Sequence, residues 1–211
     1  EIMCCPSPIV GLPETEVVEL YNNSGLLFDL DQWVLSDGTT DADLPSYVMG
    51  PGEYVVVIDE ADTALFWFLS NKVIVPTLPS LNNTGDEVFL FSNVGDMIDR
   101  VNYTDDWYQD DSKADGGWTL EQINNMAPCS GQSNWRASVA ANGGTPGTEN
   151  SVIDDTPDTS PPELQAILVQ SDTQVELVFN ETLDSNSVLM ANYTIDPSLN
   201  IAQISNVPLD Y

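Results

Sequence analysis

The residues of this sequence that are best suited to bind a ligand or a metal are aspartates crowded into short stretches. Asp105, Asp106, Asp110, Asp111 and Asp115 place five carboxylates within eleven residues. Calcium accepts about six to eight oxygen ligands in flexible geometry, so an irregular acidic loop can bind it without a strict motif. Carboxylates also crowd surface loops for solubility alone. The stretch therefore predicts either a calcium site or a solvated acidic loop.

A second candidate metal site lies further along the chain, where Asp154, Asp155 and Asp158 follow one another in a proline-rich stretch. The first stretch superficially resembles the start of an EF-hand loop. That motif fails, because Lys113 occupies a ligand position and Gln122 stands where the closing glutamate belongs. No residue pattern requires a cofactor, and calcium is the metal that the acidic stretches suggest.

The cysteines offer a covalent link between distant segments. The chain contains Cys4, Cys5 and Cys129. Adjacent cysteines do not easily bridge each other, whereas either of the first two could pair with Cys129 and leave one thiol over. A disulfide is expected if the protein is exported to an oxidising compartment. The prediction is a bridge from Cys129 to Cys4 or Cys5, with three reduced, buried thiols as the alternative.

Catalysis has few candidate groups in this sequence. The chain contains no histidine, so Ser-His-Asp and Cys-His arrangements are excluded. Carboxylate pairs are abundant enough for glycosidase-like chemistry, but they lie in loops beside glycine and proline, where a solvated surface is the ordinary outcome. Trp107 and Tyr108 lie among these carboxylates and could stack on sugar rings, although large aromatic side chains usually bury. We expect that the protein is not an enzyme.

The charge of the chain restricts its partners. Four Lys and Arg stand against 34 Asp and Glu, which gives a formal net charge of −30. Such a field repels phosphate backbones and anionic membrane surfaces, so we expect no nucleic acid partner. The longest apolar stretch, residues 64–69, is far shorter than the roughly 20 residues that cross a bilayer, so no membrane insertion is expected. Acidic surfaces are typical of exported proteins that must stay in solution.

Short apolar runs separated by turn residues predict an all-β fold. Residues 54–58 are apolar on both faces, which indicates a strand buried between two layers. Residues 88–91 and 98–103 predict a hairpin. The apolar positions of its second strand fall out of phase, which predicts a bulge near Asp99 and Arg100.

The chain is organised in two parts. Within the first part, a short helix is predicted over residues 62–69, with Asp62 as its N-cap. We expect one domain over residues 1–152 and an extended, proline-rich linker over residues 153–162. The alternating pattern of residues 163–211 predicts an incomplete second β domain, because a full sandwich needs roughly 100 residues.

A series of short motifs in order carries a family resemblance. The motifs are residues 1–3 with Pro6, 16–24, 29–30, 33–38, 50–57, 81–88, 98–103, 117–121, 128–129, 134–135 and 144–147. The series resembles the bacterial lamin tail domain, an intermediate-filament tail of immunoglobulin type. This resemblance implies an immunoglobulin-like β-sandwich over residues 1–152. Residues 177–184 and 192–194 are similar to bacterial immunoglobulin-like surface modules, which implies a partial second β-sandwich unit.

These features together predict a non-catalytic structural or binding module of a larger exported bacterial surface protein. We expect it to lie outside the cell or at the cell surface, with other domains of the same protein or other surface proteins as partners. One alternative is an accessory module of a secreted hydrolase whose catalytic domain lies elsewhere. Another is a calcium-stiffened adhesin segment. The chromatin binding of nuclear lamin relatives is not expected here, because the net charge opposes it.

Overall fold

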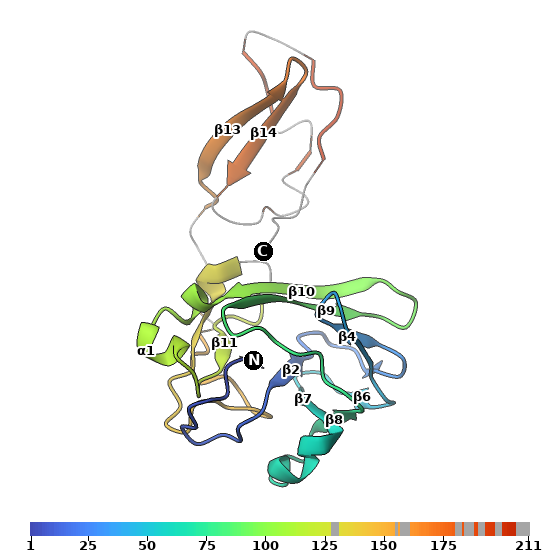
Figure 1. Cartoon of the computed structure of the whole chain (residues 1–211). Helices are drawn as coiled ribbons and strands as arrows, with labels where there is room; N and C mark the ends of the chain where they lie inside the picture. The colour runs from blue at the N-terminus through green and yellow to red at the C-terminus, as the bar shows by residue number, and fades with distance from the viewer. Residues whose placement is uncertain are drawn as a thin grey trace. The chain divides into compact units, whose positions relative to one another are not determined.

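The computed structural model of the chain divides into two compact units, residues 1–156 and residues 157–210 (Figure 1). The structure describes residues 1–127, 131–154, 156, 161–179, 183, 188–189, 193–196 and 200–205. Most regular structure in the first unit is β-strand, and the helical segments are short.

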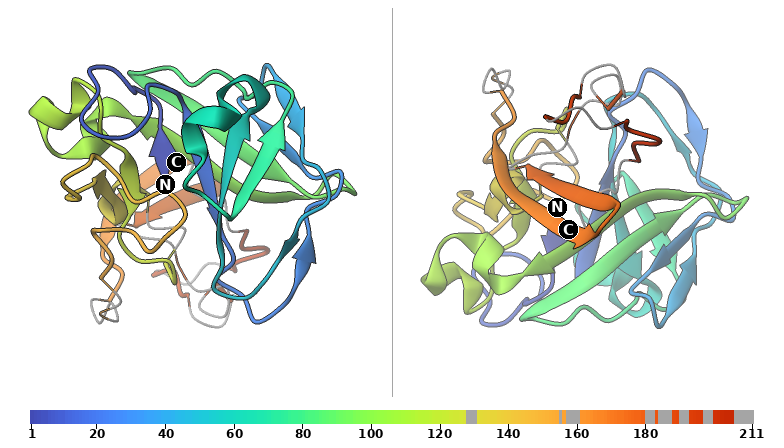
Figure 2. Two further views of the ribbon diagram at one scale, coloured as in Figure 1. Left: turned by 90° about the horizontal axis from the view of Figure 1, so that it is seen from below. Right: turned by 90° about the horizontal axis from the view of Figure 1, so that it is seen from above.

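The larger sheet of the first unit has six strands in the order β12-β11-β1-β2-β7-β8. These strands are β1 (Ile2–Met3), β2 (Val17–Tyr21), β7 (Tyr54–Asp59), β8 (Lys72–Val75), β11 (Leu120–Gln122) and β12 (Trp135–Ala137). Neighbours are antiparallel except β7 and β8, which are parallel. Parallel neighbours need a crossover between them. The 3-10 helix η1 (Glu60–Phe66) lies in this crossover, against β7 and β8 (Figure 2).

The second sheet of this unit has four strands in the order β10-β9-β4-β5. They are β4 (Val34–Ser36), β5 (Asp41–Asp43), β9 (Gly85–Phe91) and β10 (Met97–Thr104), and a small ladder pairs β3 (Phe28–Asp29) with β6 (Val48–Met49). The predicted hairpin is confirmed as β9 and β10. Its register shifts between Met97 and Asp99, which places the irregularity next to the predicted bulge.

The main core lies between these two sheets. Val55 and Val57 of β7 share one buried cluster with Leu35 of β4, Val88 of β9 and Tyr103 of β10. Side chains of both sheets therefore interdigitate, as in other β-sandwiches. The predicted fold class, an all-β immunoglobulin-like sandwich, is confirmed.

The opposite face of the six-stranded sheet carries a second, smaller buried cluster. Val56 and Ile58 of β7 lie in it with Val17 of β2 and Phe66 of η1. β7 is thus buried on both faces, as the sequence predicts. We call this second face the outer face of the sheet, and η1 covers one end of it.

The predicted helix over residues 62–69 is corrected in its position and type. The structure has a 3-10 helix that begins at Glu60, and its N-cap is Asp59, which accepts a hydrogen bond from the Ala61 backbone N–H at 2.8 Å. Asp62 instead accepts a hydrogen bond from the Thr15 hydroxyl. Asp62 lies inside the helix, whereas Asp59 caps it with Oδ1 and accepts a second hydrogen bond from the Leu78 backbone N–H with Oδ2 at 3.0 Å.

The remaining elements are short. They are η2 (Asp105–Tyr108), α1 (Asp111–Ala114) and η3 (Gly131–Asn134) in the first unit, and β13 (Leu164–Ser171) and β14 (Gln174–Phe179) in the second. β13 and β14 form an antiparallel two-stranded sheet. Within the residues that the structure describes, no helix combines the length and apolar character needed to cross a membrane.

Candidate functional site

A pair of tyrosines lies at one end of the outer face of the six-stranded sheet. Tyr21 is the last residue of β2 and lies opposite Tyr54, the first residue of β7. Their ring centroids are 4.4 Å apart and the rings are tilted by 31°. Cross-strand aromatic pairs stabilise a sheet. Both rings are only half-buried here, and they also line a pocket.

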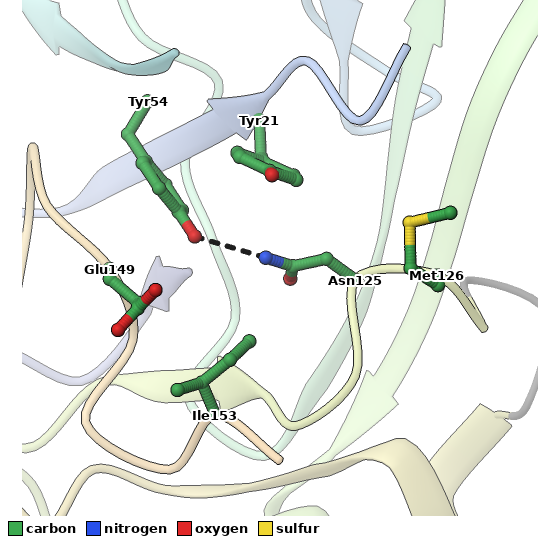
Figure 3. Close-up of a pocket in the computed structure, with 6 residues that line it drawn as sticks. All are labelled: Tyr21, Tyr54, Asn125, Met126, Glu149 and Ile153. Atoms are coloured by element: carbon green, nitrogen blue, oxygen red, sulfur yellow. Dashed lines mark hydrogen bonds between the residues drawn. The ribbon is translucent and has the colours of Figure 1, made fainter. Parts of the chain in front are cut away.

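The pocket has a volume of about 180 Å³ and collects residues from distant parts of the sequence (Figure 3). Its lining consists of Tyr21, Tyr54, Asn125, Met126, Glu149 and Ile153. Asn125 and Met126 lie in the turn after β11, and Glu149 and Ile153 lie in the segment that follows β12. We call residues 144–153 the wall segment, because it closes one side of the pocket.

Asn125 is the most buried polar residue of the pocket, with 7% of its surface exposed. Its amide nitrogen Nδ2 donates a hydrogen bond to the Tyr54 hydroxyl at 3.0 Å, and Figure 3 shows the two side chains pointing toward each other. Its backbone carbonyl accepts a hydrogen bond from Asn23 Nδ2 at 3.1 Å. The bond to Tyr54 orients the side chain and the bond from Asn23 fixes the backbone, while the amide oxygen Oδ1 has no protein partner in the described part of the chain.

The electrostatic environment of the pocket is negative. The pKa of Tyr54 is raised to about 12, mainly by burial; the hydrogen bond from Asn125 opposes this shift, and Tyr21, Glu149 and Glu19 add to it. The Tyr54 hydroxyl therefore keeps its proton at every physiological pH. The Glu149 side chain is exposed, and the described residues give it neither a hydrogen bond nor an ion pair.

Buried carboxylates hold the wall segment against the sheet. Glu19 of β2 accepts a hydrogen bond from the Gly147 backbone N–H. Glu121 of β11 accepts one from the Ser151 hydroxyl at 2.7 Å and one from the Val152 backbone N–H at 3.2 Å. Glu149 lies between these two attachment points, so its position depends on them.

The start of the wall segment is attached in the same way. The Thr145 backbone N–H donates to Glu1 at 3.0 Å, and the Thr145 hydroxyl donates to Glu121 at 3.0 Å. Burial, with a smaller contribution from the neighbouring carboxyls, raises the pKa of Glu19 to about 8 and also raises the pKa of Glu1. These carboxyls lie inside the protein, so they position the pocket and do not line it.

Comparison with known proteins covers part of this architecture. Residues 6–105 match the family model of the Lamin Tail Domain. The resemblance to a lamin tail domain is therefore confirmed for residues 6–105. This immunoglobulin-like domain is non-enzymatic. No curated protein matches the chain.

Only part of the pocket lining lies within the segment that matches the Lamin Tail Domain. Tyr21 and Tyr54 lie within the matched segment, whereas Asn125 and Glu149 lie beyond its end. The matched segment also omits β1, β11 and β12. The pocket therefore belongs to the complete first unit and not to the matched segment alone.

The five aspartates of the predicted calcium loop lie at and after the end of the lamin tail match, and the structure does not bring them together. Asp105 and Asp106 open η2, Asp110 caps α1 through the Ser112 backbone N–H at 3.1 Å, and Asp111 and Asp115 lie at the two ends of α1. Across the described residues, no group of three or more His, Cys, Asp or Glu side chains could hold a metal ion. The local fold contributes to this, because the aspartates are divided between η2 and α1, and the residues of η2 that are buried are Trp107 and Tyr108.

The aromatic residues of the same loop are buried. Trp107 is 6% and Tyr108 1% exposed, and Trp107 packs on Trp135 with ring centroids 6.2 Å apart. They are core residues, as the general tendency of large aromatics to bury indicates. A sugar-stacking role for them is wrong.

The alternative metal site cannot be assembled from the described residues. Asp154 is exposed and accepts a hydrogen bond from the Thr156 backbone N–H at 2.9 Å. Asp155 and Asp158 lie outside the described residues. This site stays a prediction.

The predicted disulfide is absent from the described part of the chain. Cys4 and Cys5 are both buried free thiols. The Cys4 sulfur lies 3.3 Å from the Tyr108 hydroxyl, and burial raises the pKa of its thiol. Cys129 lies outside the described residues, so a bridge from it to Cys4 or Cys5 stays a prediction.

Sequence reasoning does not find the pocket itself. The apolar pattern places Tyr21 and Tyr54 in strands, but their pairing depends on the register of β2 with β7. Asn125 and Glu149 stand in polar stretches without any distinguishing spacing. The usable signal is a tyrosine at the end of one strand and another at the start of the next buried strand.

Proposed function

We propose that this chain is a non-catalytic binding module of a larger exported bacterial protein, and that the pocket at the tyrosine pair is its ligand site. The pocket is the observation that carries the proposal. It is concave and pre-formed, and it combines aromatic surface with a few fixed polar groups, as small binding sites do.

The chemistry of the lining favours binding over catalysis. Hydrolysis needs a nucleophile and a base, or two carboxyls on either side of the scissile bond. Glu149 is the single carboxylate of the lining, and the Tyr54 hydroxyl stays protonated because its pKa is raised to about 12. The lining therefore offers contacts to a ligand without an acid–base pair.

The location outside the cell is part of the same proposal. A net charge of −30 supports an exported protein that stays in solution among other macromolecules. The separate second unit supports a chain built from successive modules. Other domains of the same protein or other surface proteins are the proposed partners.

An NMR titration of the isotope-labelled chain tests the binding function. Three classes of small probe are added in turn: a cation such as N-acetyl-arginine amide, a neutral sugar and inorganic phosphate. We expect at least one probe to shift the signals of Tyr21, Tyr54 and Asn125 in a saturable way. If none of the three does so at millimolar concentration, the pocket is not a ligand site and the proposed function is wrong.

A further inference from the structure

Resting on the proposed function, we infer that the pocket takes a cationic side chain, the guanidinium or ammonium group of an arginine or lysine on a basic partner protein. The lining combines hydrogen-bond acceptors, a carboxylate and aromatic rings, and it contains no basic residue. Each of these three features selects for a cation that donates hydrogen bonds.

Two acceptor groups of the pocket, the Asn125 amide oxygen and the Glu149 carboxylate, have no donor among the described residues. Asn125 uses its Nδ2 for Tyr54, which leaves its Oδ1 free to accept. Glu149 brings two carboxylate oxygens without a partner. An arginine guanidinium offers five N–H donors in a fixed plane and a lysine ammonium offers three, so either group matches an acceptor-rich site. An anion would meet the Glu149 charge directly.

The aromatic and apolar groups suit the rest of such a side chain. A cation over a tyrosine ring is attracted by the negative face of the ring. Met126, which is 74% exposed, and Ile153 provide apolar surface for the methylene stem. A volume of about 180 Å³ admits a single side chain and is too small for a helix or a strand.

The cation must come from another molecule or domain. Of the four basic residues in the sequence, Lys72 donates to the Phe66 carbonyl, Lys113 lies 4.3 Å from the Trp118 ring centroid, and Arg100 pairs with Glu87. The fourth, Arg136, lies in β12 and does not line the pocket. The net charge of −30 also draws basic partners toward the chain over long range.

The test must separate a site from general attraction between opposite charges. The labelled chain is titrated at 150 mM salt with a capped pentapeptide, glycine at every position except a central arginine, and with its citrulline counterpart. Citrulline keeps the shape of arginine and removes its charge. We expect the arginine peptide to shift the signals of Tyr21, Tyr54 and Asn125 with at least fivefold higher affinity than the citrulline peptide.

Two matched variants locate the charge that matters. Glu149→Gln removes the pocket carboxylate from an exposed position, and Glu60→Gln removes an equal charge from η1, which follows the opposite end of β7 from Tyr54. We expect at least fivefold weaker binding of the arginine peptide to Glu149→Gln and less than a twofold change for Glu60→Gln. Unchanged thermal unfolding of both variants shows that the fold is intact.

Three results would overturn the inference. They are equal affinity for the arginine and citrulline peptides, equal losses in the two variants, or shifts spread over the whole acidic surface. If the neutral sugar shifts the same three residues while the arginine peptide does not, the cation inference fails and the binding function stands. If no probe binds, both fail.

Discussion

At the scale of single residues, Glu19 is a buried carboxylate that attaches the wall segment to the sheet. It lies on the outer face of the central strand β2, 7% exposed, and attaches the wall segment through Gly147. Its other carboxylate oxygen, Oε1, is buried without a hydrogen-bond partner among the described residues. A buried carboxylate without full pairing resists ionisation, because the charged form loses its hydration. This burial is the main cause of its pKa of about 8.

The raised pKa of Glu19 predicts a pH-dependent stability. A glutamate in the unfolded chain titrates near about pH 4.3, whereas Glu19 in the folded chain has a pKa of about 8. Between these values the folded state keeps a proton that the unfolded state has released, so the free energy of unfolding falls as the pH rises. The slope for one such proton is at most about 1.4 kcal/mol per pH unit.

Urea unfolding at pH 5, 6, 7 and 8 measures this slope. We expect the wild-type stability to decrease across the series and the decrease to be clearly smaller in Glu19→Gln, which cannot titrate. Glu60→Gln, at an exposed position, is the control and should keep the wild-type slope. An identical slope in Glu19→Gln and the wild type would refute the role of Glu19.

Asn22 supplies a second prediction at this scale. It is 6% exposed, and its Nδ2 donates to the carbonyls of Leu26 at 2.8 Å and Gly50 at 2.9 Å while its Oδ1 accepts from the Ser24 backbone N–H at 3.0 Å. Asn22→Ala leaves these groups unsatisfied. The expected loss of unfolding free energy is about 2–3 kcal/mol, measured by urea denaturation. Asn142→Ala, at an exposed position, should change it by less than about 0.5 kcal/mol.

Residue types alone predict which aromatic side chains are buried but not which polar groups form the site. Trp107 and Tyr108 bury as their size indicates, yet the aspartates around them disperse because each follows the local turn. The groups that do converge, Tyr21 and Glu149, are 128 residues apart in the sequence. Local composition can show where carboxylates are dense, but tertiary pairing decides which of them share a pocket.

At the scale of elements, the sequence is most informative where burial imposes a period. The apolar run of β7 identifies a strand covered on both faces, and the phase change in β10 identifies its irregularity. The 3-10 helix η1 is harder to place, because Asp59 and Asp62 are both suitable caps by type. Both aspartates also have tertiary partners, since Asp59 accepts from the Leu78 backbone N–H and Asp62 from the Thr15 hydroxyl, and such contacts are not visible in the sequence.

The turn before β11 gives the prediction at this scale. Gly117 has φ +78°, and a Cβ there would lie 2.1 Å from the Pro8 carbonyl oxygen. Its N–H donates to the Cys5 carbonyl at 2.7 Å, so the turn fastens the chain after β1 to the start of β11. Gly117→Ala combines backbone strain with a collision against backbone, and we expect a loss of at least about 3 kcal/mol in unfolding free energy.

Two other glycines separate the causes of that loss. Gly95 has φ +86° with no atom within 4 Å of the position that a Cβ would take, and Gly25 has neither a positive φ nor such a neighbour. Denaturant unfolding should give a loss of about 1 kcal/mol for Gly95→Ala and less than about 0.5 kcal/mol for Gly25→Ala. If Gly117→Ala lowers the unfolding free energy no more than Gly95→Ala does, the backbone around Pro8 moves away from the new Cβ at little cost.

At the scale of the whole molecule, the first unit is larger than the segment that matches the Lamin Tail Domain. The match ends at residue 105, whereas the compact unit extends to residue 156. β11 pairs with β1 at Ile2 and Leu120, and β12 pairs with β11, so half of the six-stranded sheet is built from strands outside the match. The core also takes Trp107, Tyr108 and Trp135 from beyond residue 105.

Two truncations test which length is the folding unit. A chain of residues 1–156 keeps every strand of both sheets, and we expect it to unfold in one cooperative transition within about 3 °C of the first unit in the 211-residue chain. A chain of residues 1–105 leaves β1 with one neighbour and opens the core where the three aromatic residues pack. An exposed sheet edge and a missing part of the core both favour aggregation over folding.

Differential scanning calorimetry and near-ultraviolet circular dichroism distinguish the outcomes. Residues 1–105 should show neither a cooperative heat-absorption peak nor the near-ultraviolet signal of packed aromatic side chains. Residues 1–156 should show both, and they should also bind the arginine pentapeptide as the longer chain does, because all six pocket residues remain. A cooperative transition in residues 1–105 would mean that the matched segment folds alone and that β11 and β12 are additions to a finished sandwich. Because Asn125 and Glu149 belong to the later part, such a chain would then fold without its binding site.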